Sequence, residues 1–187
     1  MDITSTPIPD VRLIRPVRHA DDRGFISETW SRARFAAAGL DLDWVQDNHS
    51  GSRRMHTLRG LHFQTPPFAQ AKLVRVLRGA ILDVAVDLRR GSPWYARHVS
   101  IELTAEDGTQ ILVPKGFAHG FLTLEPDTQV LYKVDAPYSA AHDAGVAWND
   151  PDLAIDWPVG YDGVTLSDKD RRQPAFVDLP PSPFTWP

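Results

Sequence analysis

The sequence predicts an all-β sandwich or barrel with a few short helices, folded as a single domain over residues 1–187. Short alternating runs of apolar and polar residues recur between residues 72 and 134, at the roughly 8–12-residue spacing of sandwiches and barrels. The 16 prolines and 12 glycines suit a chain with many turns. No repeat, linker or long helical pattern divides the chain, and 42% hydrophobic residues can supply one core.

The N-terminal part is expected to hold one helix between short strands. The helix covers Ser31 to Leu40, because Ser31 is a suitable N-cap and Gly39 stands near the end. One strand is expected at Val11–Pro16, and a second follows a turn within Asp21–Trp30. A third strand is expected within Trp44–Ser50, where it runs into a polar loop.

The central part is expected to consist of paired strands. Lys72–Leu77 and Ala80–Leu88 are joined tightly at Arg78-Gly79, which predicts a hairpin. A second pair is expected from residues 98–103 and 109–114, followed by strands at 119–124 and 128–134. Arg89-Arg90-Gly91 is interpreted as a solvated turn, and LSDKDRR, residues 166–172, as a short helix.

Composition argues against several classes of protein. The net charge of −4 has no basic surplus, so a nucleic-acid partner is not expected. The absence of cysteine excludes thiol catalysis, zinc–thiolate sites and disulfides, and it fits a reducing compartment. We find no signal peptide and no apolar run long enough for a membrane span, which leads us to expect a soluble, cytoplasmic protein without a membrane partner.

Two short motifs resemble the two halves of the cupin signature, and they predict a double-stranded β-helix, or jelly-roll, barrel. Pro114-x-Gly116-x-x-His119 resembles the second half. In the first half, Gln64 stands where a second histidine is usual, and Lys72 stands where a glutamate is usual. A divalent metal prefers imidazole and carboxylate ligands, and an ammonium repels it. We therefore expect a cupin-like barrel whose metal site has been replaced.

A longer set of motifs narrows this resemblance to one family. The sequence is similar to the nucleotide-sugar 3,5-epimerases, whose type member is dTDP-4-dehydrorhamnose 3,5-epimerase, over about residues 8 to 175. The motifs that carry the resemblance are RGFISETW, QDNHS, LRGLHFQ, QAKLVRVLRGAILDVAVDLRRGSP, PKGFAHGFLTL, LYK, WNDPDLAIDWP and LSDKD.

The resemblance implies four catalytic residues. His62 would take a proton from a carbon next to the keto group, and Asp170 would orient its imidazole. Lys72 would stabilise the enolate oxygen, and Tyr132 would return a proton from the opposite face. Such chemistry requires no metal or other cofactor, since the 4-keto group supplies the acidity.

The resemblance also implies a nucleotide-binding set and a homodimer. Tyr138 would stack on the base, and in this family a loop or strand crosses to the partner's site. Asp143 stands where glutamate is common, which shortens a contact, and Ala71 stands where glycine is common. The full set is Arg23, Glu28, Gln46, Asn48, Arg59, His119, Tyr138, Asp143 and Lys169.

Several of these assignments have competing structural interpretations. Lys72 could be an ordinary lysine at the start of a strand, Tyr132 could be a strand aromatic packed in the core, and His119 could orient a loop.

Ser167-x-x-Asp170 also resembles a capping box, in which the acid would bind backbone donors of a helix instead of a histidine. Arg59 and His62 are separated by an odd number of residues, so a regular strand would point them to opposite faces. Both can reach one cavity only if a bulge lies near Gly60 or if the residues approach from the strand end.

The leading functional hypothesis is cofactor-independent epimerisation of dTDP-4-dehydro-6-deoxy-D-glucose at C3 and C5. A single-position epimerase of a related dTDP-4-keto-6-deoxysugar is an alternative within the same class. Alternatives from other classes are a nucleotide-sugar-binding cupin without turnover and a metal-dependent cupin enzyme.

Overall fold

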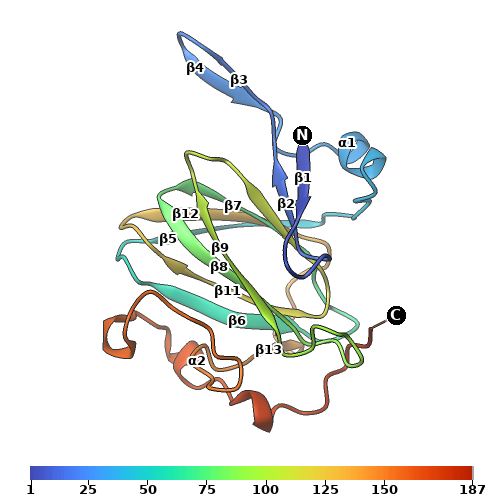
Figure 1. Cartoon of the computed structure of the whole chain (residues 1–187), viewed down its shortest axis with the longest axis vertical. Helices are drawn as coiled ribbons and strands as arrows, with labels where there is room; N and C mark the ends of the chain where they lie inside the picture. Colours follow the sequence, from blue (N-terminus) through green and yellow to red (C-terminus); the bar gives the residue numbers. More distant parts are fainter. Residues whose placement is uncertain (187) are drawn as a thin grey trace.

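Two antiparallel sheets face each other in the computed structural model of the protein, which describes residues 1–186 (Figure 1). The six-stranded sheet has the order β1 (Asp2–Ser5), β2 (Arg12–Arg15), β10 (Gln110–Val113), β7 (Lys72–Arg78), β12 (Thr128–Val134), β5 (Gln46–Ser52). The five-stranded sheet has the order β13 (Asp143–Gly145), β6 (Leu58–Gln64), β11 (Phe117–Thr123), β8 (Ala80–Asp87), β9 (His98–Thr104). This is the predicted all-β jelly roll of the cupin type.

The adjacent strands β7 and β8 lie in different sheets, so the predicted hairpin between them is wrong. The strand β7 pairs with β10 and β12, whereas β8 pairs with β9 and β11. One residue, Gly79 with φ +77°, separates the two strands and lets the chain cross between the sheets. A Cβ there would lie 2.4 Å from the Thr128 hydroxyl oxygen, so the crossing requires glycine.

The second predicted pair is wrong for the same reason. The strand β9 pairs with β8, and β10 pairs with β2 and β7 in the opposite sheet. Alternation of apolar and polar residues identified the strands themselves, but it does not specify which neighbour each strand pairs with.

The N-terminal part adds an edge to one sheet and an arm that leaves the body. The strands β3 (Arg18–Asp21) and β4 (Gly24–Ser27) form a separate hairpin that projects away from both sheets (Figure 1). The predicted helix is present as α1 (Arg32–Ala37). Ser31 stands at its N-cap position, but its side chain makes no capping hydrogen bond.

Three apolar clusters hold the layers together. The first lies between the sheets and includes Val74, Ile81 and Ile111. The second lies on the outer face of the five-stranded sheet, where segments after β13 cover it with Trp148 and Trp157. The third packs α1 against the outer face of the six-stranded sheet. Burial of these faces is the main force that fixes the sandwich.

The C-terminal part is irregular and contains short helices. The helix α2 (Asp168–Arg171) fulfils the prediction for LSDKDRR, and 3-10 turns occur at η1 (Tyr161–Gly163) and η2 (Phe176–Asp178). In Figure 1 this part lies beneath β6, and its contact with the sheet includes packing of α2 against β6.

Arg89 is buried, so the interpretation of residues 89–91 as a solvated turn is wrong at this position. Its guanidinium forms ion pairs with Asp87 at 2.6 Å and Asp10 at 3.0 Å, and it lies over the rings of Phe117 and Trp186. Burial alone would lower the pKa of Arg89, but the two carboxylates outweigh it and raise the pKa above the ordinary value. Arg89 thereby ties the C-terminal tail to the body of the protein.

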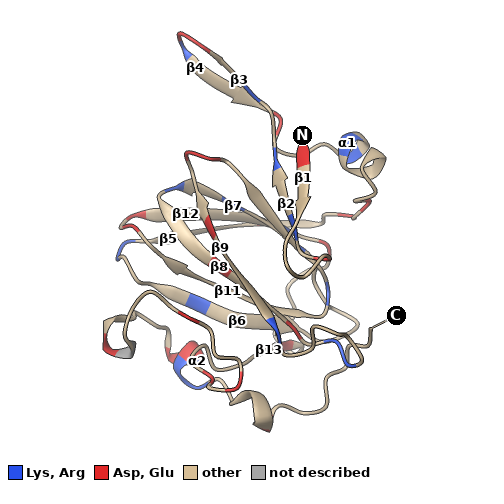
Figure 2. Ribbon diagram, in the orientation of Figure 1, with Lys and Arg blue, Asp and Glu red and all other residues tan. Residues whose placement is uncertain are grey.

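Charged residues are spread along the chain. Figure 2 shows basic and acidic residues interspersed on most elements. Within residues 1–186, no helix is long and apolar enough to span a membrane.

Candidate active site

The space between the sheets is apolar at one end and polar at the other. The polar end contains a cavity of about 420 Å³, joined to a smaller one of about 170 Å³. His62, Lys72 and Tyr132 line both cavities. The larger cavity also holds Arg59, His119 and Asp170, and the smaller one holds Gln46, Asn48, Tyr138, Asp143 and Lys169. The structure therefore brings together every predicted site residue except Arg23 and Glu28.

A bulge in β6 places Arg59 and His62 in the same cavity, as the odd spacing required. His62 pairs with His119, whereas Arg59 pairs with Phe121, so β6 holds one more residue than β11 over this stretch. Gly60 has φ +129°, and a Cβ on it would lie 2.6 Å from the Gly120 Cα. The close approach of these two glycine backbones makes the bulge possible.

His62 and Asp170 form a hydrogen-bonded pair, with 2.5 Å between Nε2 of the imidazole and Oδ1 of the carboxylate. Asp170 is nearly fully buried. Burial alone would raise the pKa of the Asp170 carboxyl, but hydrogen bonds from His62 and Ser167 and the charge of Lys169 hold it below the ordinary value. An ionised Asp170 accepts the Nε2 proton of His62 and leaves Nδ1 free to act as a base.

Lys72 extends from β7 towards the opposite sheet, and its Nζ lies 3.4 Å from the backbone oxygen of His62. Burial lowers the pKa of Lys72 to about 8, although the charges of Asp83 and Asp143 oppose the shift. The ammonium is thus charged at neutral pH, and it can stabilise an oxyanion that forms in the cavity.

Tyr132 faces His62 from the other sheet. Burial raises the pKa of the Tyr132 phenol above its ordinary value, Arg59 opposes the shift, and Asp143 adds to it. The phenol therefore carries its proton at neutral pH and can act as a donor. The cation that counters the effect of burial on the pKa of Tyr132 is Arg59.

The smaller cavity has an aromatic surface beside a charged pair. Tyr138 is exposed, and its hydroxyl donates a hydrogen bond to Asp143 at 3.0 Å. Lys169 forms an ion pair with the same carboxylate. Gln46 accepts a hydrogen bond from the Tyr138 backbone and donates one to Asn48. An exposed ring near amides and a lysine suits a nucleotide.

Asp83 is a site residue that the sequence analysis missed. It is fully buried on β8, and its two carboxylate oxygens lie 3.0 and 2.9 Å from Nε2 of His119. The signal was an aspartate inside an apolar strand, since a buried acid almost always has a partner. Asp83 fixes the orientation of His119, and its charge favours the ammonium form of Lys72.

Arg23 and Glu28 lie outside this site. Arg23 is on the β3–β4 arm, with a side chain that is 90% exposed and paired with Asp21. Glu28 follows β4 and pairs with Arg34 of α1. The arm projects away from the two sheets, whose residues line the cavity (Figure 1).

Gln64 and Lys72, which stand where the cupin signature has a histidine and a glutamate, make other interactions. Gln64 is buried, donates to the backbone oxygens of Phe68 and Pro137, and accepts from the Ser139 amide. Its amide is therefore committed to holding the chain after β12. Lys72 supplies a positive charge at the other position.

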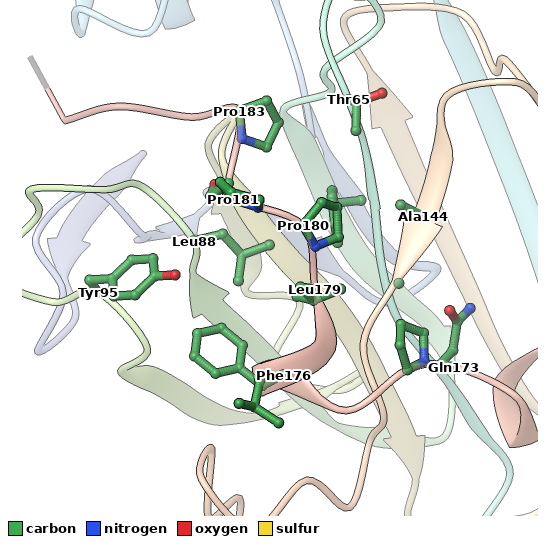
Figure 3. Close-up of a pocket in the computed structure, with 15 residues that line it drawn as sticks. Thr65, Leu88, Tyr95, Ala144, Gln173, Phe176, Leu179, Pro180, Pro181 and Pro183 are labelled. Atoms are coloured by element: carbon green, nitrogen blue, oxygen red, sulfur yellow. The ribbon is translucent and has the colours of Figure 1, made fainter.

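A second cavity of about 420 Å³ is apolar and lies under the C-terminal tail (Figure 3). Leu88, Phe176, Leu179 and several prolines line it, with Tyr95 at its side. It contains no acid–base pair, so we place the chemistry in the polar cavity between the sheets.

A jelly-roll barrel with an oriented histidine, a buried lysine and an opposed tyrosine defines an acid–base isomerase of the cupin type. The chain belongs to the dTDP-4-dehydrorhamnose 3,5-epimerase family, whose model matches residues 5–178. It is 52% identical over 182 residues to dTDP-4-dehydrorhamnose 3,5-epimerase of Sinorhizobium fredii, covering 97% of this chain and 93% of that protein.

Two solved structures bear on the site. The Legionella pneumophila dTDP-6-deoxy-D-glucose-3,5-epimerase in complex with dTDP-4-keto-L-rhamnose has a TM-score of 0.93 and 38% identity, covering 98% of this chain and 97% of that one. A 3'-monoepimerase from Streptomyces bikiniensis in complex with dTDP-quinovose has a TM-score of 0.84 and 35% identity. The match covers 91% of this chain and 86% of that one. The fold is thus common to double and single epimerases.

Proposed function

We propose that this protein epimerises dTDP-4-dehydro-6-deoxy-D-glucose at C3 and C5 to give dTDP-4-dehydro-L-rhamnose. One observation carries the proposal: His62 and Tyr132 approach a single cavity from opposite sheets. Inversion of a carbon requires a base on one face and a proton donor on the other. The two sheets supply these two groups.

The proposed reaction consists of two proton transfers at each carbon. Nδ1 of His62 takes the proton next to the 4-keto group, and the C–H electron pair moves into an enolate. The charge develops on the C4 oxygen, where the ammonium of Lys72 stabilises it. Tyr132 then donates its phenolic proton to the opposite face of the same carbon. Solvent returns a proton to the Tyr132 phenolate and takes the abstracted proton from His62, which resets both groups. Because the keto group makes these carbons acidic, the cycle needs no cofactor.

The nucleotide part of the substrate would occupy the smaller cavity. Tyr138 provides the exposed ring for the base, and Lys169 and Arg59 provide positive charge for the diphosphate. Arg23 and Glu28 would bind the nucleotide of a partner subunit, since neither lines the cavities of its own chain and the β3–β4 arm projects away from both sheets (Figure 1). The protein would then act as a homodimer.

Tyr132→Phe tests the opposed-face mechanism. In heavy water this variant should still exchange the protons at C3 and C5, because His62 removes and returns them on one face. Its formation of epimerised product should fall roughly 10²–10⁴-fold, since the second donor is absent. NMR of the recovered sugar nucleotide measures both quantities, and Tyr95→Phe, at an exposed tyrosine outside the site, is the control.

The outcomes separate the candidate functions. Exchange at one carbon only in the wild type identifies a single-position epimerase. Binding of the sugar nucleotide without exchange at either carbon identifies a non-catalytic binding protein. Full epimerisation by Tyr132→Phe would contradict the role given to Tyr132.

A further inference from the structure

Ser50 has a buried hydroxyl without a hydrogen-bond partner within residues 1–186. It belongs to a row of side chains on one face of β5, at every second residue from Gln46 to Ser52, and Gln46, Asn48 and Ser50 of this row line the two cavities. The other members have partners: Gln46 bonds Asn48 and the Tyr138 backbone, and Ser52 accepts from Nε of Arg59. Ser50 is the exception in this row.

The position of Ser50 distinguishes it from other buried groups that lack a partner. The indole nitrogens of Trp30 and Trp44 and Nε of Arg75 belong to residues that do not line either cavity of the site. Ser50 lines the larger cavity together with His62, Lys72 and Tyr132. A hydroxyl buried without a partner destabilises the folded protein, so its presence beside the reacting groups indicates that a ligand supplies the bond.

The chemistry of the surroundings indicates which part of the ligand this is. A serine hydroxyl both donates and accepts, which matches a sugar hydroxyl. Ser50 lines only the larger cavity, whereas Tyr138 and Lys169 line only the smaller one. The neighbouring guanidinium of Arg59 donates its hydrogen bonds to Ser52 and to the Gly51 carbonyl, and not to Ser50. The group that binds Ser50 is therefore expected to be a hydroxyl of the sugar.

We propose that the Ser50 hydroxyl binds a ring hydroxyl of the sugar and holds the ring against the wall that carries Tyr132. The inference rests on the proposed function, because it assigns the larger cavity to the sugar. Ser50 lies on β5, which is paired with β12, the strand of Tyr132. The bond would therefore set the distance between the sugar ring and the phenol that protonates it.

The test uses two non-reacting probes with the full-length protein. Titration calorimetry measures the Kd for dTDP and for dTDP-6-deoxyglucose, which has ring hydroxyls but no keto group. Ser50→Ala should leave the Kd for dTDP unchanged and should raise the Kd for dTDP-6-deoxyglucose roughly 3- to 10-fold, the value of one neutral hydrogen bond. Ser100→Ala, the same truncation at an exposed position on β9, should change neither.

Thermal melting separates a binding role from a structural one. The Tm of Ser50→Ala should equal or exceed that of the wild type, because the variant removes a buried hydroxyl that has no partner in the free protein. Ser50→Cys keeps the side-chain size but weakens the hydrogen bond, and it should show the same selective effect on the sugar probe.

Unchanged affinity of Ser50→Ala for dTDP-6-deoxyglucose, or an equal loss for both probes, would overturn the inference. A lower Tm with weakened binding of both probes would likewise assign Ser50 a structural role. Failure of the wild type to bind either probe would instead count against the proposed function itself.

Discussion

The Asp170 carboxylate bonds two side chains within residues 1–186, and not the backbone donors that a capping box would give it. Its partners are the imidazole of His62 and the hydroxyl of Ser167, and only the Ser167 half of the capping box is formed. The Ser167 hydroxyl accepts a hydrogen bond from the backbone N–H of Asp170, which caps α2. The same hydroxyl donates a hydrogen bond to Oδ2 of Asp170. Oδ1 is then free for His62. The Ser167 hydroxyl thereby holds the carboxylate that orients the imidazole of His62.

Lys72 makes activity and stability respond to pH in opposite directions. Burial lowers its pKa to about 8 from 10.5, so the charged form needed at the oxyanion is lost as the pH rises through 8. Between pH 8 and 10.5 the unfolded chain binds more protons at this residue than the folded chain does. The contribution of Lys72 to the free energy of unfolding therefore rises with pH over this window.

The pH profile of kcat/KM checks this prediction. The wild type should lose activity with a midpoint near pH 8, and Lys72→Arg should lack that limb because guanidinium stays charged. Tyr132 titrates above its ordinary value, so it cannot account for a limb near 8. A limb that persists in Lys72→Arg would exclude Lys72 as its source.

At the scale of the element, the bulge in β6 determines whether the site forms. Without the extra residue, either Arg59 or His62 would point to the outer face of the sheet. Gly60 and Gly120 allow the bulge because their backbones touch where other residues carry a Cβ.

Gly60→Ala should destabilise the fold by about 2–4 kcal/mol, from strain at φ +129° and from the clash with Gly120. Denaturant unfolding measures the loss. Gly51→Ala on β5 is the matched control, because a Cβ there meets nothing within 4 Å. Equal stability of the two variants would contradict the role assigned to the bulge.

The sequence predicted the strands and most of the site, but not the pairing of neighbours. The expected strand Lys72–Leu77 is present as β7, with one further residue. The predicted hairpin between this strand and the next was wrong, because apolar and polar residues alternate in the same way in a strand of either sheet. Arg89 was misjudged because its partners, Asp10 and Trp186, lie far away in the chain. Asp83 was missed because its partner His119 is brought near only by the pairing of β8 and β11.

At the scale of the whole molecule, the β3–β4 arm predicts sites shared between subunits. The Arg23→Ala and His62→Ala variants should each be inactive or severely impaired alone. If Arg23 serves the partner's cavity, a mixed dimer has one intact site, and equal mixing after unfolding and refolding together should restore about a quarter of wild-type activity.

Activity assays of the refolded mixture, coupled to a reductase that consumes the product, measure this recovery. Each variant refolded by itself is the control. No recovery in mixed dimers would show that Arg23 does not act across the interface.

The crossing at Gly79 also has a consequence for how the chain folds. Because β7 and β8 lie in different sheets, β7 cannot gain stability by pairing with the strand that follows it, although β8 pairs with β9. The partners of β6 and β7, which are β11 and β12, emerge much later in the chain. Segments that are distant in the sequence must therefore come together, with a loss of chain entropy, before their contacts can offset that loss. This is typical of domains that fold in milliseconds to seconds. The opposed walls that hold His62 and Tyr132 are built from these distant segments.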